Sequence, residues 1–474
     1  SQKDIERKDV IKENLVPGLK VGKSGIEYAK ETQLIGRYGI KRYEVNSSGK
    51  RISQIDYIKE TQGEKIKLTV DLEVQQLAQE LLKGKAGSIS AMDIYTGEII
   101  AMASSPTYDP NKFTHGIGHK DWGEIRDDPL KPLVNKSIAG LYSPGSTFKP
   151  LVALAALEFG TIDPERPILC KGHKHPYELY DVKYHCWKKQ GHGYMRLRNA
   201  IKQSCDIYFY EMARLLGVDR LAIIAKRYGL GSNILKDLYF DEKKGVVPNT
   251  LWKKNAIGKS WYLGETVING IGQGYIQTTP LQLCLMTAQI ANGGYKIKPH
   301  IIRDESINYE SARLKIANQF VNETADFSND EKFLVDRDYK LYERLYRDPK
   351  NIEFIKDAMF GSTNEQYGTS YKSRYDDVKY QYAGKTGTSQ VKRITEEERK
   401  LDLDQSQIEY KNRDHALFIA FAPYKNPRYS ISVLVEHGGS GSSGAAPLAS
   451  KLIKKIIDRH SLREQIEKGS TSLA

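Results

Sequence analysis

The strongest constraint on the fold is that strand-like segments occur in two groups separated by a long helical region. Residues 86–104, "AGSISAMDIYTGEIIAMAS", hold two alternating apolar segments around Thr96 and Gly97, which is typical of a β-hairpin. Three further apolar segments lie at 380–391, 415–423 and 429–439. Since each group must find partners to complete a sheet, we expect one sheet assembled from both ends of an α+β domain, with helices packed against it.

Helical patterns fill the intervening and flanking segments. Asp71 is a candidate N-cap for a helix whose apolar residues recur at helical spacing through Leu82. Residues 278–294 begin with threonines and a proline and end with glycines, and residues 447–460 have an amphipathic pattern. The "GIGQG" stretch at 270–274 is interpreted as a turn, because it lacks the preceding apolar strand and the following acidic residue of a nucleotide-binding loop.

Composition shifts suggest the domain organisation. Residues 1–65 are rich in Lys, Glu, Gly and Tyr and have few apolar runs, so we interpret them as a small N-terminal, non-catalytic accessory region. Residues 66–474 form the predicted main domain. Within it, the polar, His-rich segment 160–196 is interpreted as an insertion that covers the domain as a lid, and 305–378 as a charged, helical insertion.

Charge and hydropathy exclude several classes of protein. The net charge of +13 favours anionic surroundings, but the basic residues form no stripe interleaved with aromatic residues, which argues against nucleic acid as a partner. No run reaches the roughly 18 apolar residues that span a bilayer. We therefore expect any membrane anchor of the natural protein to lie outside this sequence.

A serine and a lysine stand three residues apart where the turn "SPGS" leads into an apolar helix. In "GLYSPGSTFKPLVALAAL", residues 140–157, Ser146 and Lys149 share one helical face. Serine is a weak nucleophile until a base removes its proton, and lysine at its ordinary pKa of about 10.4 is already protonated near neutrality. Burial or a second cation would depress that pKa, so the sequence predicts another positive group nearby.

Two later motifs make an incidental Ser-x-x-Lys pair improbable. "QSCD" supplies Ser204 and Asp206, and "GKTGTS" supplies a strand with Lys385 and the three residues that follow it. Such a three-part set, with Asn more usual than Asp in the second part, occurs in β-lactamases and penicillin-binding proteins. The three parts follow in the order that such a domain requires.

In these motifs the chain resembles the class B penicillin-binding proteins, which are peptidoglycan D,D-transpeptidases. Among them it most resembles the cell-elongation type, penicillin-binding protein 2. The likeness runs from about Gly22 to the final helix and includes "GKSGIEYAKETQLIG", "SSPTYDPNKF", "PLVNKSIAGLYSPGSTFKP", "WKKQGHG", "NGIGQGYIQTTPLQL" and "AGKTGTS". It implies a mostly antiparallel sheet of about five strands flanked by helices, with a helical subdomain. The usual transmembrane segment and the signature that follows it are missing at the front, and Asp206 is the less usual residue of its motif.

The resemblance also implies a mechanism. Ser146 attacks the carbonyl between the two terminal D-alanines of a donor stem peptide, and Lys149 takes its proton. Ser204 and Lys385 relay a proton to the departing D-alanine. An amine of a neighbouring stem then attacks the acyl-enzyme and forms the cross-link, and β-lactams trap Ser146.

The substrate-binding residues implied by the resemblance lie mainly on one strand. Thr386 and Thr388 hold the donor's terminal carboxylate, and the backbone N–H groups of Ser146 and Thr388 form an oxyanion hole. We expect Gly387 to be glycine because a side chain there would block the substrate backbone from pairing with the strand. No cofactor takes part in this catalysis.

Four residues in and beside the 160–196 insertion form a candidate metal site. Three sulfurs and one imidazole match the tetrahedral Cys₃His set of a structural zinc, although the spacing matches no standard zinc finger. Because one of the cysteines lies between Ser204 and Asp206, such a metal would tie the insertion to the catalytic motif. The ligand set is Cys170, Cys186, His192 and Cys205.

Alternatives to this zinc reading stay open. The cysteines could form a disulfide or remain unconnected thiols. Three other histidines could each replace His192, which is preferred because glycines flank it: His173, His175 and His185. Cys284 reads as a buried apolar thiol.

Two rival functions stay open as well. A serine D,D-carboxypeptidase or β-lactamase would need a carboxylate that activates water, for which Glu178 and Asp181 are unplaced candidates. A catalytically idle scaffold would act through residues 1–65. As partners, the resemblance implies a RodA-type glycosyltransferase and an MreC-type scaffold, at the periplasmic face of the bacterial inner membrane.

Overall fold

The structure is a computed structural model that describes residues 19–114, 116–304, 306, 309–322, 341–392 and 407–467. The chain divides into two compact units. The larger unit comprises Thr69–Tyr108, Gly118–Ile234 and Lys243–Ala474, and the smaller comprises Ser1–Leu68, Asp109–Ile117 and Leu235–Glu242. The smaller unit therefore combines the N-terminal region with two short segments from later in the chain. None of the helices among the described residues is long and apolar enough to span a bilayer.

The smaller unit contains a long antiparallel hairpin. Its strands are β1 (Ile40–Val45) and β2 (Arg51–Ile58), and every residue of the hairpin strands except Tyr43 is exposed. Two short helices, α3 (Gly25–Ala29) and α4 (Glu31–Leu34), precede it, and the 3-10 turn η1 (Pro110–Phe113) belongs to the same unit. A two-stranded ribbon without a buried face contributes little stability of its own.

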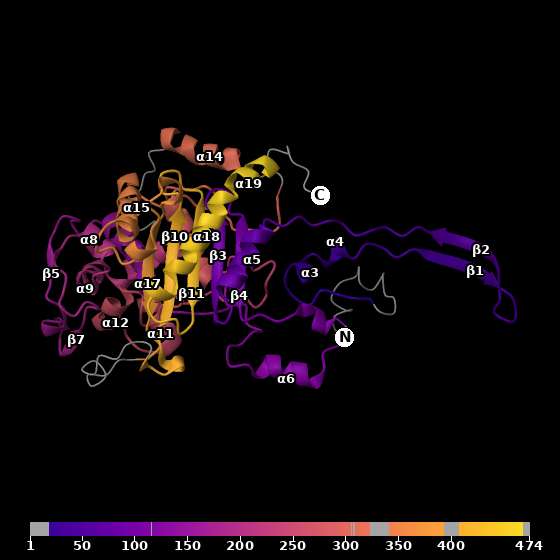
Figure 1. The fold of residues 1–474 in the computed structure, drawn as a ribbon, viewed down its shortest axis with the longest axis horizontal. Helices are drawn as coiled ribbons and strands as arrows, with labels where there is room; N and C mark the ends of the chain where they lie inside the picture. The colour runs from indigo at the N-terminus through magenta and orange to yellow at the C-terminus, as the bar shows by residue number, and fades with distance from the viewer. Residues whose placement is uncertain are drawn as a thin grey trace. The chain divides into compact units, whose positions relative to one another are not determined.

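One antiparallel sheet organises the larger unit (Figure 1). Within the described residues its five strands lie in the order β4-β3-β11-β10-β9, and every neighbouring pair is antiparallel. The prediction of a sheet built from both ends of the domain is confirmed, because β3 of the early group pairs directly with β11 of the late group. The strands are β3 (Gly87–Asp93), β4 (Ile99–Ser105), β9 (Ala383–Ser389), β10 (His415–Ala422) and β11 (Tyr429–Val435).

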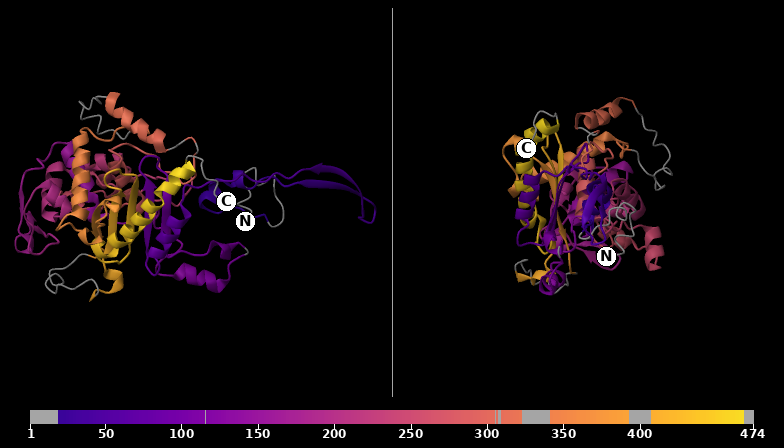
Figure 2. Two further views of the ribbon diagram at one scale, coloured as in Figure 1. Left: turned by 45° about the horizontal axis from the view of Figure 1, so that its top comes forward. Right: turned by 90° about the vertical axis from the view of Figure 1, so that its right-hand side faces the viewer.

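The period of two along each strand divides the sheet into two buried faces. On one face, Ile89 and Ile431 join a core cluster with α5 (Leu72–Leu81) and α18 (Ala446–Asp458). Figure 2 shows this sheet from two further directions, with α18 in yellow. On the other face lies α13 (Pro280–Ala291), whose Cys284 Sγ is 3.6 Å from the carbonyl oxygen of Ser90.

Caps that the sequence predicts are present at both of these helices. The carboxylate of Asp71 accepts hydrogen bonds from the backbone N–H groups of Glu73 and Val74 at the start of α5. At the start of α13, Thr279 and Gln282 form a capping box, in which each side chain accepts from the other's backbone N–H. These bonds satisfy donors that a helix start otherwise leaves free.

Helices surround the segments that carry the three motifs. α7 (Lys149–Glu158) is buried along almost its whole length, as its apolar sequence requires. α15 (Pro349–Asn364) lies in the range 305–378, but it packs against β9 and α8 and is integral to the domain. The remaining helices are α6 (His119–Asp127), α8 (Leu197–Lys202), α9 (Asp206–Leu216), α10 (Val218–Arg227), α11 (Thr250–Ile257), α12 (Leu263–Asn269), α14 (Tyr309–Asn322), α17 (Gly441–Gly444) and α19 (His460–Glu467).

Short elements complete the domain. The 160–196 segment carries two small hairpin pairings, β5 (Ile168–Cys170) with β8 (Gly193–Met195) and β6 (Tyr177–Leu179) with β7 (Val182–Tyr184). The 3-10 turns are η2 (Gly145–Phe148), η3 (Gly172–Lys174), η5 (Tyr371–Ser373), η6 (Val378–Tyr380) and η8 (Tyr410–Asn412).

Candidate active site

The candidate nucleophile lies on a tight turn seated against the sheet. Ser146 belongs to η2, immediately before α7, and is partly exposed between the buried residues Gly145 and Thr147. Gly145 has φ +53°, and a Cβ there would lie 2.4 Å from the carbonyl oxygen of Thr388 on β9. Only glycine permits both this backbone conformation and this approach, so the turn is fixed beside the strand and presents the Ser146 hydroxyl.

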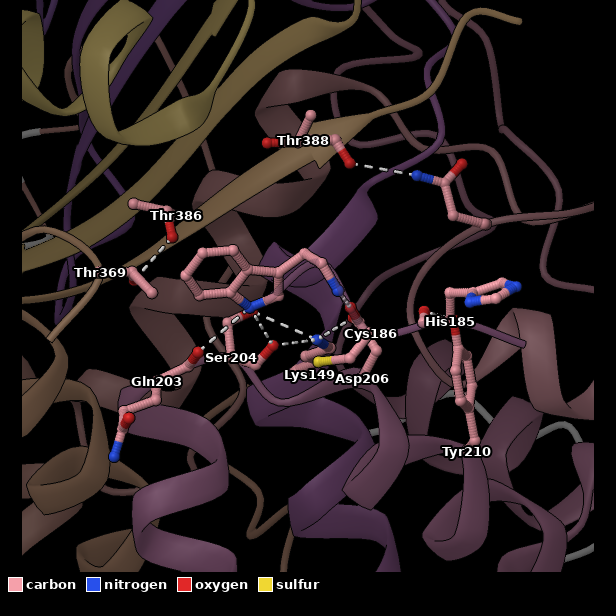
Figure 3. A network of polar contacts seen from close by, with 12 residues as sticks. Lys149, His185, Cys186, Gln203, Ser204, Asp206, Tyr210, Thr369, Thr386 and Thr388 are labelled. Atoms are coloured by element: carbon pink, nitrogen blue, oxygen red, sulfur yellow. Dashed lines mark hydrogen bonds and ion pairs between the residues drawn. The ribbon is translucent and has the colours of Figure 1, made fainter. Parts of the chain in front are cut away.

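Lys149, the first residue of α7, is completely buried and bonds to the second motif (Figure 3). Its ammonium nitrogen lies 3.0 Å from the Ser204 carbonyl oxygen, 3.2 Å from the Ser204 hydroxyl and 2.6 Å from Asp206 Oδ1. The described residues show no hydrogen bond between Lys149 and Ser146. The first two motifs predicted from the sequence therefore meet, and they do so through the lysine rather than through the nucleophile.

The second motif occupies a turn between two helices. Ser204 adopts a left-handed backbone conformation, with φ +56°, and Asp206 is the first residue of α9. A carboxylate at a helix start is favoured by the helix dipole. Burial raises the pKa of Asp206, while the adjacent Lys149 ammonium opposes that rise. The carboxylate is thus the charged partner of the buried Lys149 ammonium.

The third motif supplies the second cation that the sequence predicts. Lys385 on β9 is completely buried, and its ammonium donates to the Thr386 carbonyl oxygen at 3.0 Å. Burial lowers the pKa of Lys385 well below its usual range, the positive charge of Lys149 lowers it further, and Asp206 opposes both. Two amines and one carboxylate therefore lie close enough for their charges to act on one another.

The two threonines of the third motif lie apart along β9, each bonded to a different segment (Figure 3). The Thr386 hydroxyl donates to the Thr369 hydroxyl at 2.7 Å. The Thr388 carbonyl oxygen accepts from Gln273 Nε2 at 3.1 Å. These bonds fix both ends of the strand segment next to the nucleophile, and neither Thr369 nor Gln273 was identified from the sequence, because neither belongs to a motif with a recognised spacing.

Gly387 is glycine for a reason that the sequence did not reveal. A Cβ at this position would lie 2.7 Å from Thr147 Cγ2 and 3.0 Å from the Pro144 carbonyl oxygen. The missing side chain therefore makes room for the nucleophile-bearing turn itself. Within the described residues β9 is also the edge strand of the sheet, so the expectation that substrate backbone pairs with it stays a prediction.

The cysteine-histidine cluster converges as the zinc interpretation expects. The three sulfurs and one imidazole nitrogen of Cys170, Cys186, His192 and Cys205 all lie within 4.8 Å of one another. Hydrogen bonds from Cys186 and Cys205 lower the pKa of Cys170 to about 3, which favours the thiolate form that metals bind. The donor set and its spacing fit a tetrahedral zinc ion. All four cysteines of the chain are free thiols in the structure.

Two of the alternative histidines and one of the alternative carboxylates have other partners in the structure. His173 Nε2 bonds to the Cys186 carbonyl oxygen at 2.7 Å, and its ring packs against that of His185 at 5.2 Å. The rival's candidate Glu178 lies on the exposed hairpin of β6 and β7, where its carboxylate is 3.9 Å from the Lys183 ammonium. The cluster therefore uses His192, and Glu178 is engaged away from the buried lysines.

Trp187 connects the cluster to the hydrogen-bond partners of Lys149. It follows Cys186, and its backbone N–H donates to Asp206 Oδ2 at 2.8 Å. Its indole N–H donates at 2.9 Å to the Ser204 carbonyl oxygen, which also accepts from Lys149. Sequence reasoning missed this residue, although its position directly after a candidate metal ligand was an available signal.

Comparisons with known proteins place these features in context. Residues 87–456 match the model described as "Penicillin binding protein transpeptidase domain", and residues 1–68 match "Penicillin-binding Protein dimerisation domain". The chain is 33% identical over 450 residues to "Peptidoglycan D,D-transpeptidase MrdA" of Salmonella typhimurium strain SL1344, which covers 94% of this chain and 67% of that protein.

Solved structures agree in fold. The chain is 36% identical to Pseudomonas aeruginosa PBP2 in a crystal structure with WCK 5153, with a TM-score of 0.72 over 92% of this chain and 83% of that one. It is 30% identical to the chain matched in a complex between PBP2 and MreC from Helicobacter pylori, with a TM-score of 0.75 over 92% of this chain and 72% of that one.

Proposed function

Because the chain belongs to the penicillin-binding protein transpeptidase family, we propose that it cross-links peptidoglycan stem peptides during cell elongation, with Ser146 as the acylated residue. The observation that carries this assignment of roles is the meeting of the three motifs around Lys149. Its ammonium contacts Ser204 and Asp206 directly, and its charge acts on Lys385. A Ser-x-x-Lys pair on a surface helix would have none of these partners.

The acylation step needs an unprotonated amine. Ser146 Oγ attacks the carbonyl carbon between the terminal D-alanines, and its proton passes to Lys149. The charge on that amine is balanced by Asp206, 2.6 Å away, while the second cation, Lys385, is held in a buried place that disfavours its charge. This arrangement lets one proton move within the group without creating an unpaired buried charge.

For D-alanine to leave, its nitrogen must receive a proton. The Ser204 hydroxyl lies 3.2 Å from the Lys149 ammonium, so it can receive a proton from Lys149 and pass its own to the leaving nitrogen, with Lys385 as the second amine of the relay. The peptide C–N bond breaks, D-alanine leaves as the amine, and an ester to Ser146 remains. Attack by an amine of a second stem breaks that ester and restores the Ser146 hydroxyl.

The strand β9 is suited to hold the donor. Thr386 and Thr388 supply hydroxyls for the terminal carboxylate, beside the buried positive charges. The backbone N–H groups of Ser146 and Thr388 are assigned to the oxyanion hole, where each such donor commonly contributes about 3 kcal/mol to transition-state stabilisation. The approach of Gly145 to Thr388 supports this pairing of donors.

Mass spectrometry after exposure to a labelled penicillin tests the proposal. We expect one adduct on the peptide that contains Ser146 and none in Ser146→Ala. An adduct elsewhere, or no adduct on folded protein, would refute the assignment. Rapid loss of the adduct would favour the hydrolytic alternative. Full restoration of cell shape by Ser146→Ala, in cells that lack the unaltered protein, would favour the idle scaffold.

For the cysteine cluster we propose a structural zinc held by Cys170, Cys186, His192 and Cys205. Support comes from the convergence of the four ligand atoms within 4.8 Å and from the burial of the three cysteines. A metal here would brace the 160–196 segment against Ser204 and Asp206, and it would take no part in bond making.

Metal analysis of two matched variants tests the zinc proposal. Cys186→Ser should lose the bound zinc. It should also melt at a lower temperature, because the free energy of zinc binding no longer contributes to folding. Cys284→Ser alters a buried thiol on α13, outside the cluster, and should keep its zinc. Unchanged zinc in Cys186→Ser would refute the site.

The partners and location that we propose follow the family. The Helicobacter pylori relative is known in complex with MreC, which supports an MreC-type scaffold as a partner here, and a RodA-type glycosyltransferase would supply glycan strands. Stem peptides and β-lactams are the proposed small ligands. The substrate places the domain at the periplasmic face of the inner membrane.

A further inference from the structure

Four aromatic side chains form a surface cluster on α11, in the segment that joins α11 to α12 and in the turn after α12. The rings of Trp252 and Tyr275 lie 5.4 Å apart, and those of Trp261 and Tyr275 lie 6.2 Å apart. Tyr262 is 62% exposed and Tyr275 is 38% exposed, while both tryptophans are half-buried. We call these four residues the aromatic platform.

A buried lysine holds the platform rigid. Lys253 is 1% exposed, and its ammonium lies 4.5 Å from the ring centre of Tyr262 and 5.8 Å from those of Trp261 and Tyr275. Its charge is paired with Glu265 Oε1 at 2.5 Å. Cations attract the faces of aromatic rings, so this one ion pair fixes three rings at once.

Hydrogen bonds orient individual rings further. The indole N–H of Trp261 donates to the Thr266 hydroxyl at 2.7 Å, and the backbone N–H of Tyr262 donates to Glu265 Oε2 at 2.9 Å. Rings that are already ordered lose little conformational entropy when they bind a ligand.

The platform adjoins the catalytic strand through the turn at 270–274. Gln273 Nε2 donates to the Thr388 carbonyl oxygen, and the Gly272 carbonyl oxygen accepts from the Gly145 N–H at 2.8 Å. Tyr275 follows Gln273 by two residues, a span of at most about 7 Å. A polymeric substrate held on β9 therefore has the platform within reach of its nearest sugars.

We propose that the aromatic platform binds the glycan strand of the substrate, through β-linked N-acetylhexosamine units. This inference rests on the proposed function, since it assumes that the stem peptide arrives attached to a sugar chain. The apolar C–H face of a pyranose packs on a flat ring, while the polar edges of Tyr and Trp can bond to hydroxyl and acetamido groups. Aliphatic residues would offer neither a flat face nor polar edges, and a rigid aromatic surface with a few polar groups is typical of small-ligand sites.

Titration with N,N′,N″-triacetylchitotriose tests the platform. Two of the chain's four tryptophans belong to it, so intrinsic fluorescence should change on binding and saturate. Trp252→Ala and Trp261→Ala should each weaken binding at least about tenfold, as loss of a buried aromatic anchor commonly does. Tyr262→Ala removes an exposed ring and should weaken binding without the risk of misfolding. Trp122→Phe, on α6, should bind as the unaltered protein does.

The two proposals fail in different ways. Absence of a penicillin adduct on Ser146 of the unaltered protein would refute the proposed function whatever the sugar does. Absence of saturable binding, equal binding by the platform variants and Trp122→Phe, or equal affinity for maltotriose, would each overturn the platform. If a purified protein partner bound to the platform and no sugar bound there, the proposal would also be overturned.

Discussion

Two lysine–carboxylate ion pairs, each with a buried lysine, lie in the same domain and have nearly the same N···O distance. Lys149 bonds to Asp206 at 2.6 Å, and Lys253 bonds to Glu265 at 2.5 Å. Both lysines are almost completely inaccessible to solvent. A desolvated ion pair of this kind is costly unless its remaining donors are also satisfied, and the two regions satisfy them differently.

The surroundings of each pair decide what it can do. Lys149 has the hydroxyl and carbonyl of Ser204 beside it and a second cation, Lys385, close enough to have its pKa lowered. Lys253 has aromatic rings instead, which attract a fixed cation but cannot accept a proton. We therefore expect the lysine of such an ion pair to transfer protons when a hydroxyl and a second charge lie next to it. We expect it to have a structural role when aromatic rings lie next to it.

We expect the largest effect in a comparison of the acylation rates of Lys149→Met and Lys253→Met. Loss of the general base should slow acylation by penicillin roughly 10²- to 10⁴-fold in protein that is still folded. Lys253→Met should instead show itself in stability, by roughly 3 kcal/mol, because it leaves Glu265 without its partner. Acylation kinetics and thermal unfolding of both variants measure the contrast, and folded Lys253→Met with no acylation would break it.

Asp206→Asn should have an intermediate effect, visible in the pH dependence. Lys385 has a lowered pKa that Asp206 partly restores, so removal of the carboxylate lowers that pKa further. Lys385 is the second amine of the proposed relay, so the limb of the acylation pH profile that reports Lys385 should move to lower pH. Glu265→Gln alters the other pair and should leave the midpoint of that limb in place, whereas a shift to higher pH in Asp206→Asn would contradict the effect of Asp206 on the pKa of Lys385.

Trp187→Phe should give the smallest effect. The ring is kept, but the indole N–H bond to the Ser204 carbonyl oxygen is lost, which costs about 1 kcal/mol and slows acylation by roughly fivefold. Trp122→Phe serves as the control for loss of an indole elsewhere. An acylation rate equal to that of the control would show that Trp187 does not help to position Lys149 through Ser204.

Local patterns in the sequence were sufficient for the elements and for the motif residues. Alternation at 86–104 predicted β3 and β4, and Asp71 and Thr279 cap the helices that their positions indicated. The three motifs could be identified because their internal spacing is fixed by one turn or one strand. The residues that join the motifs, Trp187, Thr369 and Gln273, belong to no such pattern and were missed.

What the sequence determined by itself was therefore the kind of sheet and the positions of the three motifs, because period and spacing are properties of neighbouring residues; the roles of Ser146, Lys149 and Lys385 stay predictions. Only the tertiary structure decided that Lys149 bonds to Ser204 and Asp206, more than 50 residues away, and that Gly387 makes room for the turn of Ser146. It likewise decided which of the two buried lysines lies beside a hydroxyl and a carboxylate and which among rings. Contacts of this kind depend on how distant segments pack together, and close packing is a property of the whole fold rather than of any one segment.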